Sequence, residues 1–244
     1  MEGSVPPSTP TVDDLRGSTV VVTGVGRPGQ VGEVVAAAFA SVGARTMLID
    51  RDEKAMDRAA AVGGSAHGFA CDLTDPIATG RVAEEIAALS PNGVRAVVHL
   101  AGGYLEGSPV ADTDPTNWHK LFSINLTTAF IATRSLLPLV RQARGALVYF
   151  ASAAALPGAS VTNTAAYAAA KGGVITLMRA VAAEEKKAGV RANALAPQAI
   201  RTEANLSSMG TEKQYVDRET IAAWVLWLAS AAAGPISGQV IRIG

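Results

Sequence analysis

Cysteine is almost missing from this sequence, because its 244 residues contain only Cys71. One cysteine cannot form an internal disulfide, and chains without disulfides are typical of the reducing cytoplasm. We therefore expect a cytoplasmic protein in which Cys71 is a small buried residue at the end of a strand.

Net charge and long hydrophobic segments are missing too. The 21 basic residues balance 21 acidic ones, so no overall field attracts nucleic acid or an anionic membrane. The longest apolar stretch, 221–233, is too short to cross a bilayer and is interrupted by Ser230. Residues 1–14 lack the basic and apolar regions of a secretory signal, and we expect a flexible tail there. We expect a small-molecule partner, and no nucleic acid, membrane or metal.

Hydrophobic residues, by contrast, make up 49% of the chain, enough for a large core. Short β-branched runs alternate with longer helical stretches and are not joined by hairpin signals, which predicts a parallel sheet. Runs such as Val20-Val21-Val22 are apolar on both faces, as in a sheet covered by helices on each side. We predict one α/β domain over residues 15–244 with a doubly wound, seven-stranded sheet. The expected strands are 19–23, 45–50, 66–71, 95–101, 146–152, 190–196 and 239–243, and the expected helices are 32–42, 53–62, 76–89, 115–141, 164–187 and 219–230.

Glycine is concentrated in the turn after the first strand. Glycines between a strand and a helix let the backbone approach a pyrophosphate, whose charge then lies at the helix N-terminus. A tight loop without a ligand has the same composition, so this turn is weak evidence by itself. The residues concerned are Thr23, Gly24, Gly26, Arg27, Gly29, Val31 and Gly32.

Two carboxylates support a nucleotide site. Asp50 ends the second strand, where it could accept hydrogen bonds from an adenosine ribose or serve only as a turn residue. Asp72 ends the third strand, where it could accept from an adenine amino group or cap the next helix. Because Asp50 would repel a 2′-phosphate, we predict NAD over NADP. Arg27 and Arg51 could bind such a phosphate and argue the other way.

Tyr167 and Lys171 are four residues apart, which places both on one face of a helix. A phenol has a pKa of ~10, and a neighbouring ammonium lowers that pKa by favouring the phenolate. Such pairs are common on helices, so the pair alone decides little. Ser152 adds weight because it ends the preceding strand, on the crevice side where open α/β sheets bind ligands. Asn125, in the helix before that strand, is a further candidate.

Together these residues resemble the short-chain dehydrogenase/reductase family, in its common form with a Tyr-x-x-x-Lys active site. The resemblance extends from about residue 16 to the C-terminus. It implies a single-domain Rossmann fold and hydride transfer between a nicotinamide cofactor and a secondary alcohol or ketone. The matching residues, in family order, are Thr23, Gly24, Asp72, Ala101, Gly102, Asn125, Ser152, Tyr167, Lys171, Pro197, Ile200 and Thr202.

The resemblance also implies roles. Tyr167 would be the general acid/base, and Ser152 would orient the carbonyl. Lys171 would bind the nicotinamide ribose and lower the tyrosine pKa, Asn125 would hold a water in a proton relay, and Thr202 would contact the carboxamide. The implied cofactor-binding residues are the seven loop residues above together with Asp50, Arg51, Cys71, Asp72, Leu73, Ala101, Gly102, Tyr167, Lys171, Pro197, Ile200 and Thr202.

The sequence departs from the family pattern in several places. The glycine loop is two residues longer than usual, and Gln198 replaces the glycine that usually follows Pro197. His99 replaces an asparagine, and we expect it to be satisfied by its neighbours rather than to bind a ligand. Segment 203–218 is short for a substrate cover, so the pocket is expected to be open or closed by a neighbouring subunit.

Other functions stay open at this point. A regulatory or structural homologue without catalysis should lack Tyr, Lys or Ser at the active positions. A sugar-nucleotide epimerase or dehydratase has a larger C-terminal region than follows Thr202, and an enoyl reductase spaces its Tyr and Lys more widely. Small residues in helix 164–187, together with helix 115–141, predict a homodimer or homotetramer.

Overall fold

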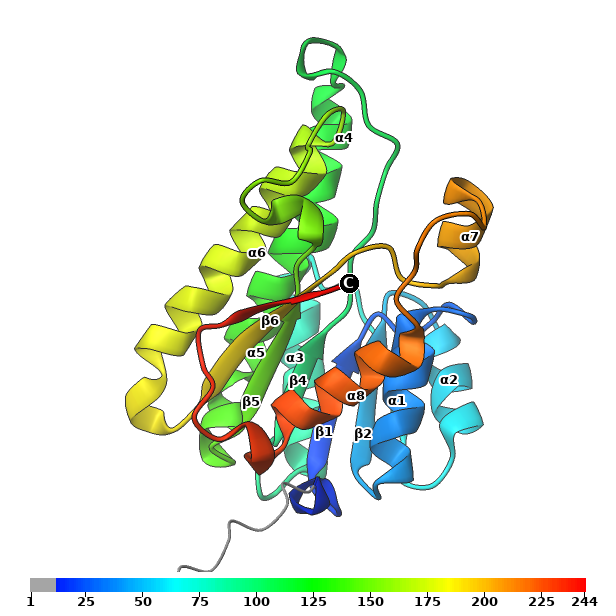
Figure 1. Cartoon of the computed structure of the whole chain (residues 1–244). Helices are drawn as coiled ribbons and strands as arrows, with labels where there is room; N and C mark the ends of the chain where they lie inside the picture. The colour runs from blue at the N-terminus through cyan, green and yellow to red at the C-terminus, as the bar shows by residue number, and fades with distance from the viewer. Residues whose placement is uncertain (1–11) are drawn as a thin grey trace, which may run out of the picture.

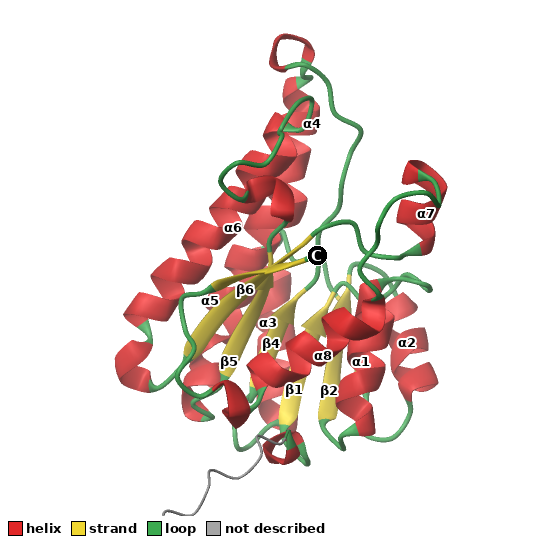
Figure 2. Cartoon of the chain, viewed as in Figure 1, coloured by secondary structure: helices red, strands yellow, loops and turns green. Residues whose placement is uncertain are grey.

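The alternating apolar runs form one sheet of seven parallel strands in the computed structural model, which describes residues 12–244 (Figures 1 and 2). The strands are β1 (Thr19–Thr23), β2 (Arg45–Asp50), β3 (His67–Ala70), β4 (Ala96–His99), β5 (Ala146–Phe150), β6 (Arg191–Pro197) and β7 (Val240–Ile243). Their order is β3-β2-β1-β4-β5-β6-β7, so the chain builds outward from β1 in both directions. This confirms the predicted doubly wound Rossmann fold.

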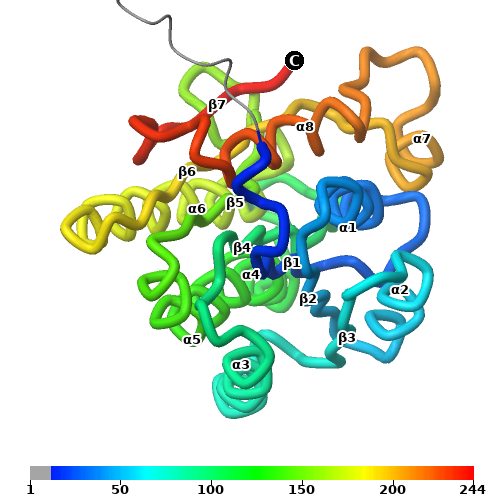
Figure 3. Tube along the Cα trace, turned by 90° about the horizontal axis from the view of Figure 1, so that it is seen from below, coloured from blue at the N-terminus to red at the C-terminus, as the bar shows by residue number. Residues whose placement is uncertain are grey.

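Helices cover both faces of the sheet. They are α1 (Val31–Ser41), α2 (Lys54–Val62), α3 (Pro76–Leu89), α4 (Pro115–Phe122), α5 (Thr128–Gln142), α6 (Ala165–Glu184), α7 (Glu203–Met209) and α8 (Arg218–Ala229). Side chains alternate in direction along a strand, so Val20 and Val22 share a core with α1, α2 and α8, and Val21 shares one with α3, α5 and α6. Figure 3 shows these two groups of helices on opposite sides of the sheet.

All seven strands end at the same edge of the sheet, since they are parallel. In Figure 1, α4 and the first turns of α6 rise above this edge on the left and α7 rises on the right. Segments that follow strands therefore meet there, which is where open α/β sheets bind their ligands.

Two predicted elements differ from the structure. The expected helix 115–141 contains a π-turn, Ser123–Thr127, between α4 and α5. Helix α7 was not predicted, because its seven residues carry no apolar periodicity; the Thr202 side chain starts it by accepting the Asn205 amide at 3.2 Å. The other elements differ from prediction by a few residues at their ends.

The expected tail, residues 1–14, lies largely outside the described residues, which begin at Val12. Asp13 and Asp14 lie in a short 3-10 helix, and the Asp14 carboxylate pairs with Arg95 at 2.7 Å. It also accepts the Ala231 amide at 2.9 Å. These two residues belong to the domain rather than to a tail. Within residues 12–244, no helix is both long and apolar enough to cross a bilayer.

Candidate active site

The site begins where β1 and β4 end side by side. The Thr23 hydroxyl accepts the Ala101 amide at 3.1 Å and donates to the Val98 carbonyl at 3.4 Å, which ties the glycine loop to the segment after β4. Gly24 has φ +78°, and a Cβ there would lie 2.6 Å from the Ala101 nitrogen. Only glycine fits, so the two backbones approach closely at the ligand edge of the sheet.

The loop then turns into α1. Gly32 packs so closely against the Gly24 carbonyl that a Cβ would overlap it. Gly29, in the lengthened part of the loop, has φ +68°, in the left-handed region that favours glycine. The glycine backbone thus comes close to the N-terminus of α1, which fits the pyrophosphate of the predicted cofactor.

Asp50 lies at the end of β2 against this loop. Its Oδ2 accepts the Gly26 amide at 2.7 Å, and its Oδ1 accepts the Arg51 amide at 2.8 Å. Each carboxylate oxygen has a second lone pair, so both can also accept from ribose hydroxyls. The side chains of Arg27 and Arg51 are exposed.

Asp72 follows β3 at the neighbouring strand end. Its Oδ1 accepts the Thr74 hydroxyl at 2.7 Å and the Thr74 amide at 2.9 Å. These hydrogen bonds lower the pKa of Asp72, and the charge of Arg51 adds to them. Asp75, not Asp72, caps α3, so the capping interpretation of Asp72 was wrong. Cys71 and Leu73 are buried on either side of it, and burial raises the pKa of the Cys71 thiol.

Lys171 is buried in the first half of α6. Its Nζ donates to the Phe150 carbonyl at 2.8 Å and lies 5.9 Å from the centre of the Tyr167 ring. Burial lowers the pKa of Lys171 to about 8. The strand that ends in Phe150 also delivers Ser152, so strand and helix together assemble Ser152, Tyr167 and Lys171 at one point.

The environment of Tyr167 differs from the expectation that its pKa is lowered by Lys171. Burial is the largest influence and raises the pKa of Tyr167, while the Ser152 hydroxyl opposes that rise. Ser152 Oγ accepts the Ala154 amide at 3.2 Å, which holds the hydroxyl in place. Tyr104, which no sequence motif marks, is half exposed, and its ring meets that of Tyr167 edge-on with 5.3 Å between the ring centres.

Asn125 lies in the π-turn and is buried. Its Nδ2 donates to the carbonyls of Leu121 and Gly103, both at 2.9 Å, and its Oδ1 accepts the Gly103 amide at 3.2 Å. A Cβ on Gly102 would lie 2.6 Å from Asn125 Oδ1 and 3.5 Å from Lys171 Nζ. The bare backbone of Gly102 therefore faces both polar groups.

The segment after β6 closes the other side. Pro197 ends the strand, Ile200 pairs with Val216, and Thr202 is buried with its hydroxyl used as the cap of α7. Helix α7 lies next to the glycine loop, because a Cβ on Gly29 would lie 2.7 Å from the Glu203 carboxyl carbon.

His99 is buried, and its neighbours satisfy only one of its two ring nitrogens, whereas the sequence had led us to expect both to be satisfied. It stacks on Tyr149 with 4.6 Å between ring centres, and its Nε2 lies 3.2 Å from the Thr133 hydroxyl. Burial lowers its pKa to about 3, so His99 is neutral. No group within residues 12–244 bonds to its Nδ1.

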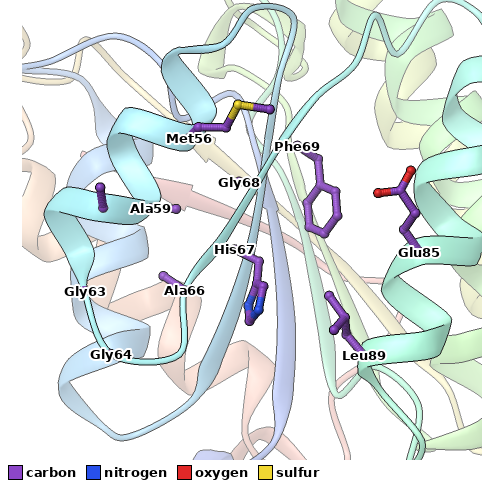
Figure 4. A pocket seen from close by; sticks show the side chains of 11 residues that line it. Met56, Ala59, Gly63, Gly64, Ala66, His67, Gly68, Phe69, Glu85 and Leu89 are labelled. Carbon is purple, nitrogen blue, oxygen red and sulfur yellow. The ribbon is translucent and has the colours of Figure 1, made fainter.

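A separate cavity of about 580 Å³ opens at the β3 edge of the sheet, between α2 and α3 (Figure 4). Its lining includes the apolar side chains of Met56, Phe69 and Leu89. None of the residues predicted to bind the cofactor or to catalyse lines it, so it is not the active site. Among residues 12–244, no three His, Cys, Asp or Glu side chains lie together as metal ligands would.

Several known proteins resemble this chain in sequence or in fold. Residues 24–243 match a family model described as enoyl-(acyl carrier protein) reductase. The chain is 34% identical to galactitol 2-dehydrogenase (L-tagatose-forming) of Cereibacter sphaeroides, over 96% of both chains. It is 30% identical to D-threitol dehydrogenase of Mycolicibacterium smegmatis, over 94% of this chain and 92% of the relative. A Beutenbergia cavernae structure, described as a candidate NAD(P)-dependent gluconate 5-dehydrogenase with NADP bound at low occupancy, matches with TM-score 0.83 and 30% identity over 93% of this chain and 95% of that one.

Proposed function

The chain belongs to the short-chain dehydrogenase/reductase family and is an oxidoreductase, and we propose that it oxidises a secondary alcohol of a polyol to a ketone. The hydride acceptor in this reaction is NAD. The main support for this proposal is that Ser152, Tyr167 and Lys171 lie together at the carboxyl ends of the strands. The names of two relatives, a galactitol and a D-threitol dehydrogenase, support a substrate with neighbouring hydroxyl groups.

The protein's own task in this reaction is to move a proton, because the bound cofactor takes the hydride. Tyr167 accepts the proton of the alcohol hydroxyl as a phenolate, which the Ser152 hydroxyl and the charge of Lys171 would favour against the effect of burial. The Ser152 hydroxyl donates to the alcohol oxygen as it becomes a carbonyl. Lys171, whose pKa is lowered to about 8, releases a proton of its own and then takes up the one that Tyr167 accepted. Because Gly102 faces both Lys171 and Asn125, a water held there links the relay to the Asn125 amide.

Tyr167→Phe tests the role of the phenol. We expect kcat for a polyol to fall by about 10²–10⁴-fold, the usual contribution of a general acid/base, with an unchanged dissociation constant for NAD. Tyr104→Phe is the matched control, because it removes a neighbouring hydroxyl and keeps the ring. The assay is the absorbance of reduced nicotinamide with a panel of polyols and simple secondary alcohols. Retention of more than about a tenth of the activity by Tyr167→Phe would contradict the assignment.

The preference for NAD rests on Asp50, which lies at the ribose end of the loop while Arg27 and Arg51 are exposed. NADP would lose hydrogen bonds to this carboxylate and bring a 2′-phosphate of about −1.5 to −2 charge beside it. We expect a preference of roughly tenfold to a hundredfold in kcat/KM, equivalent to ~1.4–3 kcal/mol. Asp50→Ala should reduce that ratio and Asp52→Ala should not. A wild type that uses NADP equally well would refute the preference.

We also propose a cytoplasmic homodimer or homotetramer built on α4, α5 and α6. Supporting this, large apolar side chains are exposed on the first two of these helices, among them Trp118 and Phe130. Small residues such as Ala168, Ala169 and Gly172 permit helices of two copies to approach closely on α6.

A further inference from the structure

Arg58 reaches from α2 to the start of the lengthened glycine loop. Its Nε donates to the Val25 carbonyl at 3.2 Å, and its Nη1 forms an ion pair with Glu33 at 2.7 Å. Only 11% of the Arg58 side chain is exposed. The planar guanidinium makes both bonds at once, which fixes the distance between the loop and α1.

Glu33 completes the contact from the first turn of α1. One carboxylate oxygen pairs with Arg58, and the other accepts the Gly29 amide at 2.7 Å. The Gly29 hydrogen bond is the largest of the influences that lower the pKa of Glu33, so the carboxylate is charged. The two side chains thus hold Val25 and Gly29, one on each side of Gly26, Arg27 and Pro28.

We propose that Glu33 and Arg58 form a clamp that keeps the lengthened loop in its cofactor-binding shape. Two extra residues add conformational freedom that an unrestrained loop would lose only when it closes on the cofactor. The clamp removes that freedom in advance, from outside the binding surface. This inference rests on the proposed function only in naming a nicotinamide dinucleotide as the ligand.

Charge is the second part of the clamp. A carboxylate in the first turn of α1 lies close to the helix N-terminus that would bind a pyrophosphate, and the two negative charges repel each other. Arg58 offsets the charge of Glu33 at 2.7 Å. Removal of Arg58 alone therefore releases Val25 and leaves only the weaker influence of Arg218 to offset the charge of Glu33.

Cofactor binding without substrate tests the clamp. Dissociation constants for NAD and NADH, measured by titration calorimetry, should rise about tenfold or more in Arg58→Ala and about fivefold in Glu33→Ala. Arg58→Lys keeps the charge and one bond, and should recover part of the affinity. The control is Arg95→Ala, which breaks an ion pair of equal length at the opposite end of the sheet and should leave binding unchanged. With saturating cofactor, kcat should stay within about threefold in every variant.

Glu33→Ala also tests the opposite hypothesis, in which Glu33 weakens cofactor binding. If Glu33 merely occupied an amide that the cofactor needs, its removal would tighten binding. Tighter binding in Glu33→Ala, or a dissociation constant of Arg58→Ala within about threefold of wild type, would overturn the proposal.

Hydrogen exchange of the free protein supplies a readout that needs no cofactor. The Gly29 amide should exchange about tenfold faster in Glu33→Ala than in wild type, because its acceptor is gone. Unchanged exchange would also overturn the clamp. A wild type that binds neither NAD nor NADP would instead overturn the proposed function, and the exchange result would still decide whether the clamp exists.

Discussion

Lys171→Met removes a cation that is buried in the candidate active site. The side chain is 7% exposed, and its Nζ donates to the Phe150 carbonyl at 2.8 Å. Burial lowers the pKa of Lys171 from 10.5 to about 8. The folded protein therefore releases this proton far more readily than the unfolded chain does.

The sign of the effect follows from proton binding. Between pH 8 and 10.5 the unfolded chain holds a proton that the folded protein has released, so the free energy of unfolding rises with pH. At 1.36 kcal/mol per pH unit, the buried ammonium destabilises the wild type by roughly 3 kcal/mol at pH 7. About 2 kcal/mol of that loss is recovered by pH 9.5.

The variant loses the same carbonyl bond at every pH, which destabilises it by about 1–3 kcal/mol. At pH 7 this loss nearly cancels the gain from removing the cation, so the two proteins should have similar stability. Between pH 7 and 9.5 the free energy of unfolding of the wild type should rise by about 2 kcal/mol relative to that of the variant, so the wild type should be the more stable at pH 9.5. For a chain of this size the difference in Tm should change by about 4–8 °C.

The assay is urea or thermal unfolding of both proteins at intervals from pH 7 to 9.5. Lys187→Met, at an exposed lysine, is the control, and its difference from wild type should not change with pH. A difference between wild type and Lys171→Met that stays within about 0.5 kcal/mol across the range would refute the reasoning.

Three further predictions concern single positions. Gly32→Ala should prevent stable folding or cofactor binding, because its Cβ would overlap the Gly24 carbonyl; thermal unfolding with and without NAD checks this, and a near wild-type result would contradict it. Tyr104→Ala should lower kcat/KM for the alcohol by up to about tenfold without changing the dissociation constant for NAD, because an edge-on ring pair contributes about 0.5–1.5 kcal/mol; an equal loss in Tyr104→Phe would show that the hydroxyl matters instead. Phe130→Glu should convert the proposed oligomer into a smaller species by light scattering, and a wild type that is already monomeric at micromolar concentration would dismiss the interface.

The sheet could be predicted because each strand is marked by a short run of neighbouring residues. A strand buried on both faces is a continuous apolar run, and Val20-Val21-Val22 and Ala96-Val97-Val98 have that form. The positions of Ser152 and Asp50 followed from the same property, since each lies at or just beyond the end of such a run.

Contacts between distant elements could not be obtained in this way. Arg58 resembles any other polar residue of an amphipathic helix until the fold places α2 beside the glycine loop. Tyr104 lies in a segment without periodicity, and only its edge-on contact with Tyr167 marks it. The hydroxyl of Thr202 starts α7, a role that depends on backbone geometry rather than on composition.

The π-turn at Ser123–Thr127 depends on the number of residues between α4 and α5 rather than on which residues they are. A π-turn holds one more residue than the α-helical path between the same flanks. Loss of one residue, such as Ile124, would let α4 and α5 continue as a single α-helix and would shift Asn125 relative to Leu121, whose carbonyl its amide contacts. An insertion or deletion, and not a substitution, thus separates a helix that serves the reaction from one that only covers the sheet. Variant libraries made by point substitution never sample that step, whereas a library of single-residue deletions does.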